Sequence, residues 1–348
     1  MKAFILNQRG VDGARNGTAV KPQRGDGEVL IRMLAASLNR VDLYMRDSGA
    51  GISHSLPQIM GIDGVGEVVE APAGANLVTG QRVILYPYEF CGTCPHCLAG
   101  DQPLCLSARI LGEHRDGTLA EYVSLPARSV LPLSPEADPA EAAALGVAYL
   151  TAWRMVFGKA PFSPGQTVLV QGAGGGVSFA AAQLAQMAEA RVIVTSTGDD
   201  KLTRCRDAGF HAVDYAGNAL DEILDLTRGK GADLVIDNVG EATWGLSMRA
   251  ARRGGNLVTC GATTGAQPGA DLQRLFVRQL SVHGSTMGSL TEFERLISCY
   301  ENGAFRIPID STYALEDTAV GLQRLSAPDR FGKIVISIAA PSSTGDTP

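Results

Sequence analysis

Four cysteines lie close together in the segment FCGTCPHCLAGDQPLC, where two, two and seven residues separate them. Thiolates at this spacing can converge on one soft divalent ion, and four of them leave no ligand position open for water or substrate. The spacing therefore predicts a closed, structural zinc site rather than disulfides or free thiols. His96 lies within the loop, but four thiolates already complete the coordination of the ion. The predicted ligands are Cys91, Cys94, Cys97 and Cys105.

A run of glycines in VLVQGAGGGVS lies between strand-like and helix-like sequence. A backbone without Cβ atoms can approach a pyrophosphate closely, and the free N–H groups at a helix N-terminus favour an anion. Because the run also opens a series of alternating strands and helices, it predicts a dinucleotide site rather than a plain tight turn. Ser178 occupies the place of the third glycine in the usual fingerprint and is small enough to be tolerated. The residues predicted to contact the cofactor are Gly172, Gly174, Gly175, Gly176 and Val177.

The choice between NAD(H) and NADP(H) is expected at the end of the next strand, RVIVT. A carboxylate there would bind the free 2′-hydroxyl of NAD(H), but the chain has the hydroxyls of Ser196 and Thr197. Asp199 and Asp200 follow a few residues later, where we expect them to cap the next helix. Lys201 offers a positive charge to a 2′-phosphate, with a solvated surface lysine as the alternative. This pattern predicts NADP(H).

The elements that must position these residues fall into two kinds. From residue 27 to about residue 133, short β-branched runs broken by Gly and Pro predict a β-rich half with long loops. After residue 166, short apolar runs (TVLVQ, RVIVT, DLVID, NLVTC, SVHGS) alternate with helical sequence, as over residues 177–189 and 272–278. Such runs are typical of a parallel sheet buried on both faces. The predicted fold class is α/β, with a doubly wound domain and a closing strand, KIVISI, that returns to the β-rich half.

Composition limits the classes of protein to consider. A chain of 348 residues suggests two domains, and only residues 341–348 read as a flexible tail. The net charge of −6 argues against nucleic acid as a partner, and no apolar run is long enough for a membrane helix. The start, MKAFIL, reads as a strand and not as a signal peptide. Seven cysteines are an odd number, and four of them lie in one short loop, a pattern that favours metal binding over disulfides. The expected compartment is therefore the reducing cytoplasm. The expected partner is a small molecule.

Over essentially its whole length the sequence resembles the medium-chain dehydrogenase/reductase superfamily. The resemblance rests on SLNRVDLYMRDSG, GIDGVGEVVE, the cysteine loop, ALGVAYLTAW, GAGGGVS and FGKIVI. It implies a GroES-like catalytic domain over residues 1–147, completed by residues 286–340, and an inserted Rossmann domain over residues 148–285. It also implies a cleft between the domains and an assembly into homodimers or homotetramers.

Zinc alcohol dehydrogenases of this superfamily carry catalytic ligands at three positions, which here hold Asn39, Ile62 with Asp63, and Val147. Isoleucine and valine cannot coordinate a metal, so the resemblance predicts no catalytic zinc. In lacking these ligands, the chain is similar to members of the quinone oxidoreductase and enoyl reductase branches, which carry Asn at the position of Asn39. An atypical metal site that recruits Asp63 and a histidine stays open as an alternative.

Without a Lewis acid, the expected reaction is hydride transfer to an acceptor that spreads negative charge by conjugation, a quinone or an α,β-unsaturated carbonyl compound. By resemblance, Asn39 would donate to the developing oxyanion and Thr151 would lie beside the nicotinamide ring. Tyr215 and Lys333 would reach the adenosine phosphate. Tyr44, His54 and His114 are further polar candidates. The residues expected to line the cofactor groove are Asn238, Gly261, Ala262 and Met287.

Two other functions remain open from the sequence. The first is an alcohol or aldehyde dehydrogenase, and the second is a non-enzymatic protein that binds NADPH. The glycine loop predicts only that the chain binds a cofactor, so it does not distinguish an enzyme from a protein that merely binds NADPH.

Overall fold

The computed structural model describes residues 1–49 and 55–340, and the chain divides into two compact units. The first unit is Met1–Val147 with Ser289–Pro348, and the second is Ala148–Gly288. The chain re-enters the first unit at Ser289, three residues later than the 286 expected from the sequence. His54 and the predicted tail at 341–348 lie outside the described residues.

The first unit is built on a seven-stranded sheet with strand order β10-β6-β5-β3-β18-β17, on which β9 also pairs with β3. The longest strand, β3, reads EVLIRMLAASL and is buried along most of its length. The C-terminal strand β18 runs antiparallel to β3 and pairs Ile334 with Leu38. KIVISI therefore returns to the β-rich half, as expected. The strands are β3 (Glu28–Leu38), β5 (Asp63–Glu70), β6 (Arg82–Leu85), β9 (Tyr122–Pro126), β10 (Val130–Pro132), β17 (Ile309–Ala314) and β18 (Lys333–Ser337).

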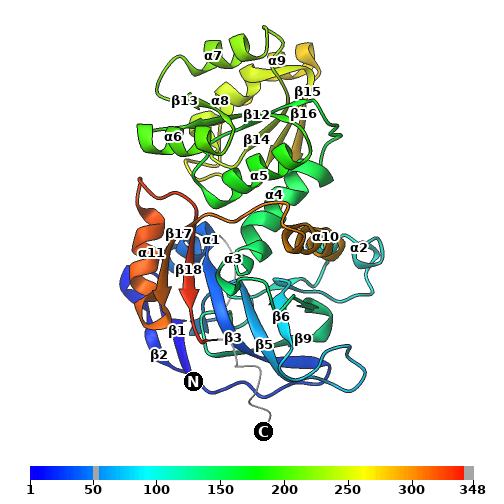
Figure 1. Ribbon diagram of the computed structural model, residues 1–348, viewed down its shortest axis with the longest axis vertical. Coiled ribbons are helices and arrows are strands. Elements are labelled where there is room, and N and C mark those ends of the chain that lie inside the picture. The colour runs from blue at the N-terminus through cyan, green and yellow to red at the C-terminus, as the bar shows by residue number, and fades with distance from the viewer. Residues whose placement is uncertain (50–54, 341–348) are drawn as a thin grey trace. The chain divides into compact units, whose positions relative to one another are not determined.

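Smaller elements complete the first unit (Figure 1). A three-stranded sheet has the order β2-β1-β4, and a two-stranded sheet pairs β7 with β8 beside the cysteine loop. A core of apolar side chains from β1, β3, β18 and α11 includes Phe4, Leu38, Leu322 and Ile336. The elements are β1 (Lys2–Leu6), β2 (Ala14–Thr18), β4 (Gln58–Ile59), β7 (Tyr88–Glu89), β8 (Arg109–Ile110), α1 (Arg40–Asp47), α2 (Pro95–Leu98), α3 (Pro139–Ala142), α10 (Leu290–Glu301) and α11 (Thr318–Ser326).

The second unit is a six-stranded, fully parallel sheet with the order β13-β12-β11-β14-β15-β16. Leu169, Ile193 and Val235 are buried in a core shared with α7 and α8, while α5 contacts β11 and β12. This confirms the doubly wound domain. The elements are β11 (Thr167–Val170), β12 (Arg191–Ser196), β13 (His211–Asp214), β14 (Ala232–Asp237), β15 (Ala251–Thr259), β16 (Ser281–Gly284), α4 (Leu150–Trp153), α5 (Gly176–Met187), α6 (Asp199–Asp207), α7 (Ala219–Leu226), α8 (Glu241–Ala250) and α9 (Leu272–Arg278).

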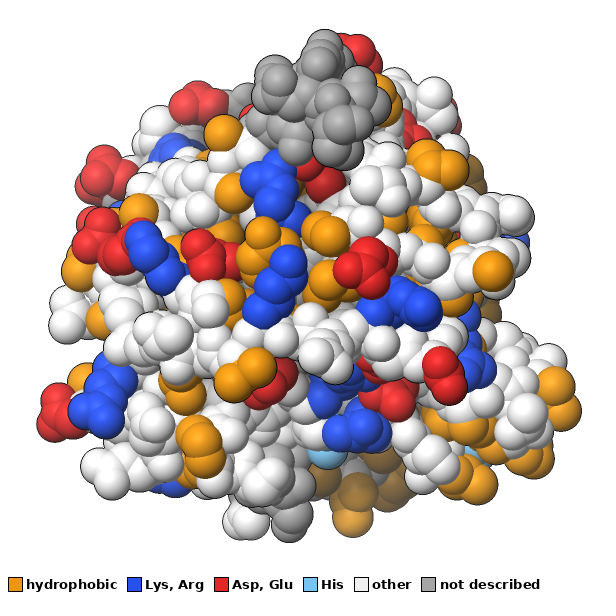
Figure 2. Space-filling view, turned by 90° about the horizontal axis from the view of Figure 1, so that it is seen from below, with side chains coloured by type: hydrophobic (Ala, Val, Ile, Leu, Met, Phe, Trp, Pro, Cys, Tyr) orange, Lys and Arg blue, Asp and Glu red, His pale blue; other side chains and the backbone are white. Residues whose placement is uncertain are grey.

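The strand order reverses at β11, whose two neighbours are β12 and β14. In doubly wound sheets this reversal opens a crevice at the carboxyl ends of the strands, where ligands bind. β15 begins at Ala251 rather than at Asn256 as NLVTC suggests, because Ala251 pairs with Ala232 before the register shifts. No helix in the described ranges is both long enough and apolar enough to cross a bilayer. Figure 2 shows basic and acidic side chains intermixed on one face of the molecule.

Candidate functional site

The four cysteines of the FCGTCPHCLAGDQPLC loop converge as predicted. Their sulfur atoms all lie within 4.8 Å of one another. Cys91 Sγ is 3.8 Å from Cys97 Sγ and 3.6 Å from Cys105 Sγ. A tetrahedral site with Zn–S bonds of about 2.3 Å has S···S edges of about 3.8 Å, whereas a disulfide would need about 2.05 Å. The donor set therefore fits a structural zinc ion.

Backbone N–H groups hold the sulfur atoms in this arrangement. Thr93 N and Cys94 N lie 3.5 and 3.3 Å from Cys91 Sγ, and Cys91 N lies 3.4 Å from Cys105 Sγ. These donors lower the pKa of the Cys91 thiol to about 6, which favours the thiolate that a metal requires. Along the described chain, no other group of three or more His, Cys, Asp or Glu side chains converges in this way. His96 is not among the ligands.

The glycine loop connects β11 to α5 at the strand-order reversal. Gly172 has φ +70°, and a Cβ atom there would lie 2.7 Å from Val239 Cγ2. Gly174 has φ +118°, a conformation that other residues rarely adopt. Gly175 is the N-cap of α5, which begins at Gly176 and continues with Val177. The first N–H groups of a helix have no partner within it, so this loop and helix end can receive a pyrophosphate.

Ser178, at the place of the third fingerprint glycine, joins the loop to two strands. Its Oγ is buried and lies 2.8 Å from Gln171 O and 2.8 Å from Asn238 Oδ1. Gln171 follows β11 and Asn238 follows β14. The serine therefore fastens α5 to the carboxyl ends of both strands and places the predicted cofactor residue Asn238 at this edge.

A buried polar network lies behind the glycine loop and was not predicted. Thr195 Oγ1 accepts from Gly172 N at 3.2 Å and donates to Gln171 Oε1 at 2.5 Å. Gln171 Nε2 donates to Ser247 Oγ at 3.0 Å, and Ser247 Oγ donates to Asp237 Oδ2 at 2.6 Å. The sequence does carry a signal for it, since each of the apolar runs TVLVQ, RVIVT and DLVID ends in a polar residue.

The residues expected to read the ribose have different surroundings. Ser196 is buried and its Oγ donates to Ala173 O at 2.7 Å, so this hydroxyl braces the glycine loop. Thr197 is exposed beyond the strand tip. The expectation that Asp199 and Asp200 cap the next helix is wrong, because Gly198 is the N-cap and both aspartates lie in the first turn of α6. Lys201 follows them and is half-buried.

The remaining predicted cofactor residues of the second unit lie on several of its elements. Tyr215 follows β13, its backbone N–H donates to Ser196 O at 2.9 Å, and its hydroxyl donates to Ala242 O. Gly261 and Ala262 are exposed after β15, and a Cβ atom on Gly261 would lie 3.2 Å from Asn238 O. Asn238 and Gly261 are thus brought together. Thr151 is buried in α4, and Met287 is buried with φ +45°.

In the first unit, a buried polar network surrounds the predicted catalytic residue Asn39, which caps α1. Lys333 Nζ donates to Asn39 Oδ1 at 2.5 Å and to Leu38 O at 3.0 Å. Asn39 Nδ2 lies 3.2 Å from both Ser37 O and Asp63 Oδ2. Lys333 is only 4% exposed. The prediction that Lys333 reaches the adenosine phosphate stays a prediction, and the structure places its ammonium group in the network around Asn39.

Burial dominates the electrostatics of this network. It lowers the pKa of Lys333 to about 8, against the opposing charges of Asp63 and Asp42. It raises the pKa of Asp42 to about 7, although Asn39 N donates to Asp42 Oδ2 at 2.7 Å. The pKa of Asp63 is also raised by burial. Burial thus acts against the charged form of all three groups, while the charge of Lys333 opposes the rise in the pKa of Asp42 and of Asp63.

The positions that carry catalytic zinc ligands in zinc alcohol dehydrogenases do not fit a metal here. Ile62 and Val147 are buried and have no donor atom. Asp63 Oδ1 accepts from Ser37 Oγ at 2.8 Å, and its other oxygen faces the Asn39 amide. His114 Nδ1 accepts from Ile110 N at 3.2 Å. Within the described ranges, no histidine joins Asp63 in a metal-binding group.

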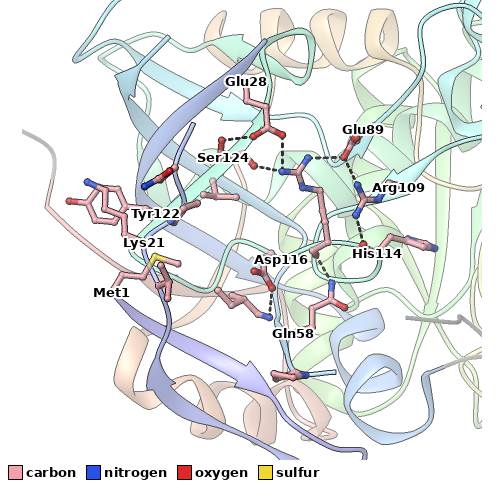
Figure 3. Close-up of a pocket in the computed structure, with 18 of the residues that line it drawn as sticks. Met1, Lys21, Glu28, Gln58, Glu89, Arg109, His114, Asp116, Tyr122 and Ser124 are labelled. Carbon is pink, nitrogen blue, oxygen red and sulfur yellow. Dashed lines mark hydrogen bonds and ion pairs between the residues drawn. The ribbon is translucent and has the colours of Figure 1, made fainter. Parts of the chain in front are cut away.

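A cavity of about 690 Å³ opens on the first unit, away from Asn39 and Lys333, neither of which lines it. Arg115 bonds both Glu28 and Glu89, and Figure 3 shows Arg109 beside Glu89. The Arg115 ion pairs measure 3.1 Å to Glu28 and 2.7 Å to Glu89. Of the polar candidates, only His114 lines this cavity among the described residues, while Tyr44 is exposed on α1.

Comparisons with known proteins agree with this architecture. Residues 25–135 match the family described as alcohol dehydrogenase GroES-like domain, and residues 176–302 match the zinc-binding dehydrogenase family. An NAD-dependent alcohol dehydrogenase of Sulfurisphaera tokodaii is 30% identical over 90% of this chain and 94% of its own length. Acryloyl-coenzyme A reductase of Metallosphaera sedula is 26% identical over 97% of this chain and 100% of its own. A solved structure of an NAD-dependent alcohol dehydrogenase is 37% identical, with TM-score 0.93, over 97% of this chain and 100% of its own.

Proposed function

Because the chain belongs to the medium-chain dehydrogenase/reductase superfamily, in its zinc-type alcohol dehydrogenase-like group, we propose which reaction this oxidoreductase performs. It transfers hydride from NADPH to a conjugated acceptor, a quinone or an α,β-unsaturated carbonyl compound, without a catalytic zinc ion. The observation that carries the proposal is the Lys333–Asn39 contact, 2.5 Å long, at a position where zinc enzymes of this superfamily hold a metal ligand.

A fixed positive charge can replace part of what a Lewis acid does. A bound dihydronicotinamide supplies the hydride, and negative charge then develops on the acceptor oxygen. The Lys333 ammonium group, buried and held by Asn39 and Leu38, is preorganised to stabilise such charge in a site of low dielectric constant. The Asn39 amide already donates toward Ser37 and Asp63, so its role in the proposal becomes that of positioning Lys333. A saturated alkoxide, which cannot delocalise charge, is a poorer fit.

The preference for NADPH is supported by the end of β12. The exposed residue at its tip is Thr197, which has no carboxylate to repel a 2′-phosphate. Lys201 follows Thr197 by four residues and lies in the first turn of α6. The Sulfurisphaera relative is named as NAD-dependent, so cofactor choice is a test that separates this chain from that relative.

The test is a steady-state assay of quinones, enones and simple alcohols with both cofactors. We expect turnover of conjugated acceptors with NADPH and little oxidation of alcohols, with initial rates unchanged by chelators. Acryloyl-coenzyme A, named for the Metallosphaera relative, is itself a conjugated carbonyl compound and belongs in the panel. Faster oxidation of a simple alcohol than reduction of any conjugated acceptor would contradict the proposal.

The second candidate is an alcohol dehydrogenase, which is favoured by the names of the relatives. A zinc count separates the two, because the proposal requires one zinc ion per chain, held by the four cysteines, whereas a zinc alcohol dehydrogenase requires two. A non-enzymatic NADPH-binding protein would bind the cofactor and turn over none of the panel.

We also propose that the chain forms a homodimer or homotetramer. Leu272, Phe276 and Val277 on α9 and Val282 on β16 are large apolar side chains that are between 45 and 68% exposed. β16 ends the six-stranded sheet. Apolar side chains gathered beside a sheet edge are a surface that a second copy can cover.

A further inference from the structure

Asp237, the last residue of β14, is a fully buried acid whose carboxylate is surrounded by hydrogen-bond donors. Asp237 Oδ1 accepts from Val239 N at 2.9 Å and from Gly240 N at 3.0 Å. Asp237 Oδ2 accepts from Ser247 Oγ at 2.6 Å, and Thr243 Oγ1 lies 2.9 Å from both carboxylate oxygens. Asp237 takes part in no ion pair with another described residue, so these donors offset the cost of its burial.

The same carboxylate is one end of a chain of hydrogen bonds that reaches the glycine loop. Ser247 Oγ, which donates to Asp237, accepts from Gln171 Nε2 at 3.0 Å. Gln171 Oε1 accepts from Thr195 Oγ1 at 2.5 Å, and Thr195 Oγ1 accepts from Gly172 N at 3.2 Å. None of the four side chains is more than 1% exposed. The chain therefore joins the glycine loop after β11 to the end of β14 through the protein interior.

The two ends of this chain fix the direction of every hydrogen bond in it. The Gly172 N–H group can only donate, and a carboxylate can only accept. Each hydroxyl has one proton, so Thr195 and Ser247 both donate in the direction of Asp237. Hydrogen bonds that are aligned in this way strengthen one another in an interior of low dielectric constant. Removing one link should therefore loosen the links on both sides of it.

The two backbone segments at the ends of the chain are segments predicted to contact the cofactor. The glycine loop is bonded twice to Thr195, because Ala173 N also donates to Thr195 O at 2.8 Å. At the other end, the Asp237 carboxylate holds the backbone of the turn over residues 238–240, which carries Asn238. One buried chain thus braces both segments.

We propose that Thr195, Gln171, Ser247 and Asp237 are positioning residues for the cofactor, an inference that rests on the proposed function. The chain holds the glycine loop and the turn over residues 238–240 in place before binding, so that the N–H groups of the loop are ready to receive a pyrophosphate. Preorganisation of this kind raises affinity, because less conformational freedom is lost on binding. Since all four side chains are buried, they act through these backbone segments and not by touching the cofactor.

The test breaks the chain at its middle with Ser247→Ala, which takes one partner from Gln171 Nε2 and one from Asp237 Oδ2. We expect the Kd of NADPH, measured by fluorescence titration, to rise by about tenfold or more. NADPH and NADH share the pyrophosphate, so the Kd of NADH should rise by a similar factor. An unchanged Kd for both cofactors overturns the proposal.

The matched control is Thr227→Val, at a buried hydroxyl of the same unit. Thr227 Oγ1 accepts from Gly231 N at 3.0 Å and donates to Ile223 O at 2.9 Å, so it makes as many bonds as Ser247 Oγ but lies near the amino end of β14. Its removal should leave the Kd within about twofold of the unmodified protein. An equal rise of Kd in Thr227→Val would mean that the effect of Ser247→Ala is a general loss of stability, and the proposal would fail.

A double-variant cycle distinguishes one chain from separate contacts. Thr195→Val keeps the shape and removes the acceptor of Gly172 N, whereas Thr195→Ser keeps the hydroxyl and should retain affinity. Because Thr195 and Ser247 belong to one chain, the protein with both Thr195→Val and Ser247→Ala should have a Kd below the product of the two separate increases by about threefold or more. Increases that simply multiply would contradict the chain. If Ser247→Ala does not fold, the comparison of Thr195→Val with Thr195→Ser decides, and equal Kd values would refute the proposal.

Hydrogen exchange needs no cofactor and separates this inference from the proposed function. In the unliganded protein the Gly172 amide should be protected, and Ser247→Ala should speed its exchange by about tenfold or more, while Thr227→Val should not. Exchange at Gly172 that Ser247→Ala leaves unchanged would overturn this inference alone. Failure of the unmodified protein to bind either NADPH or NADH would overturn the proposed function, and with it the role of the chain in binding.

Discussion

At the scale of single residues, the choice of cofactor depends on the tip of β12. Ser196 is buried against Ala173 O, so the exposed Thr197 is the position to change. A charge-assisted contact between Lys201 and a 2′-phosphate would be worth about 1.5–3 kcal/mol, which is about a ten- to hundredfold preference for NADPH. Thr197→Asp should erode this preference and Lys201→Ala should weaken NADPH while sparing NADH. Dissociation constants from fluorescence titration check both, and a native preference for NADH would contradict the assignment.

The raised pKa of Asp42 predicts that the stability of the folded protein depends on pH. Its pKa is about 7 in the folded protein against an ordinary value of 3.8. The folded state therefore holds this proton more tightly, and the resulting stability is complete below about pH 4 and lost as pH rises through about 7. Three pKa units correspond to at most about 4 kcal/mol. The Asp42→Asn variant cannot lose this proton. Between pH 5 and pH 8 its unfolding midpoint should therefore rise relative to that of the unmodified protein. Asp26→Asn, at an exposed aspartate, should show no such gain.

At the scale of elements, local segments and the return of KIVISI to the β-rich half were predictable, but the side-chain contacts that this return creates were not. The cysteine loop and the glycine loop each lie within one short stretch of chain, so spacing alone indicates their chemistry. Lys333 meets Asn39 only because β18 pairs with β3 across 294 residues of sequence, and a motif at one end of the chain cannot show this.

At the same scale, we predict that zinc stabilises the cysteine loop. Two short strands, β7 and β8, and the four-residue helix α2 contain too little apolar surface to hold the loop closed, so zinc must supply much of its stability. Cys94→Ser should lose the zinc ion and lower Tm, while kcat of the fraction that remains folded changes little. Cys299→Ser, outside the loop, is the control and should keep the metal. Elemental analysis and thermal unfolding check this, and loss of turnover at unchanged Tm would contradict the structural assignment.

At the scale of the whole molecule, the question is whether a second copy covers α9 and β16. Phe276 is 68% exposed and Leu272 is 65% exposed, and the strand beside them ends its sheet. Burying apolar surface of this kind in a contact between two copies stabilises that contact by about 25 cal/mol per Å². Light scattering coupled to size exclusion should therefore give a mass that is a multiple of the 36.5 kDa chain. Phe276→Glu places a charge in the contact and should shift the protein toward the monomer. Val78→Glu replaces an equally exposed apolar residue of the first unit and should leave the mass unchanged. A native protein that is monomeric at micromolar concentration would remove the assembly, but would leave the reaction proposed at Lys333 standing, since Lys333 and Asn39 belong to the same unit of one chain.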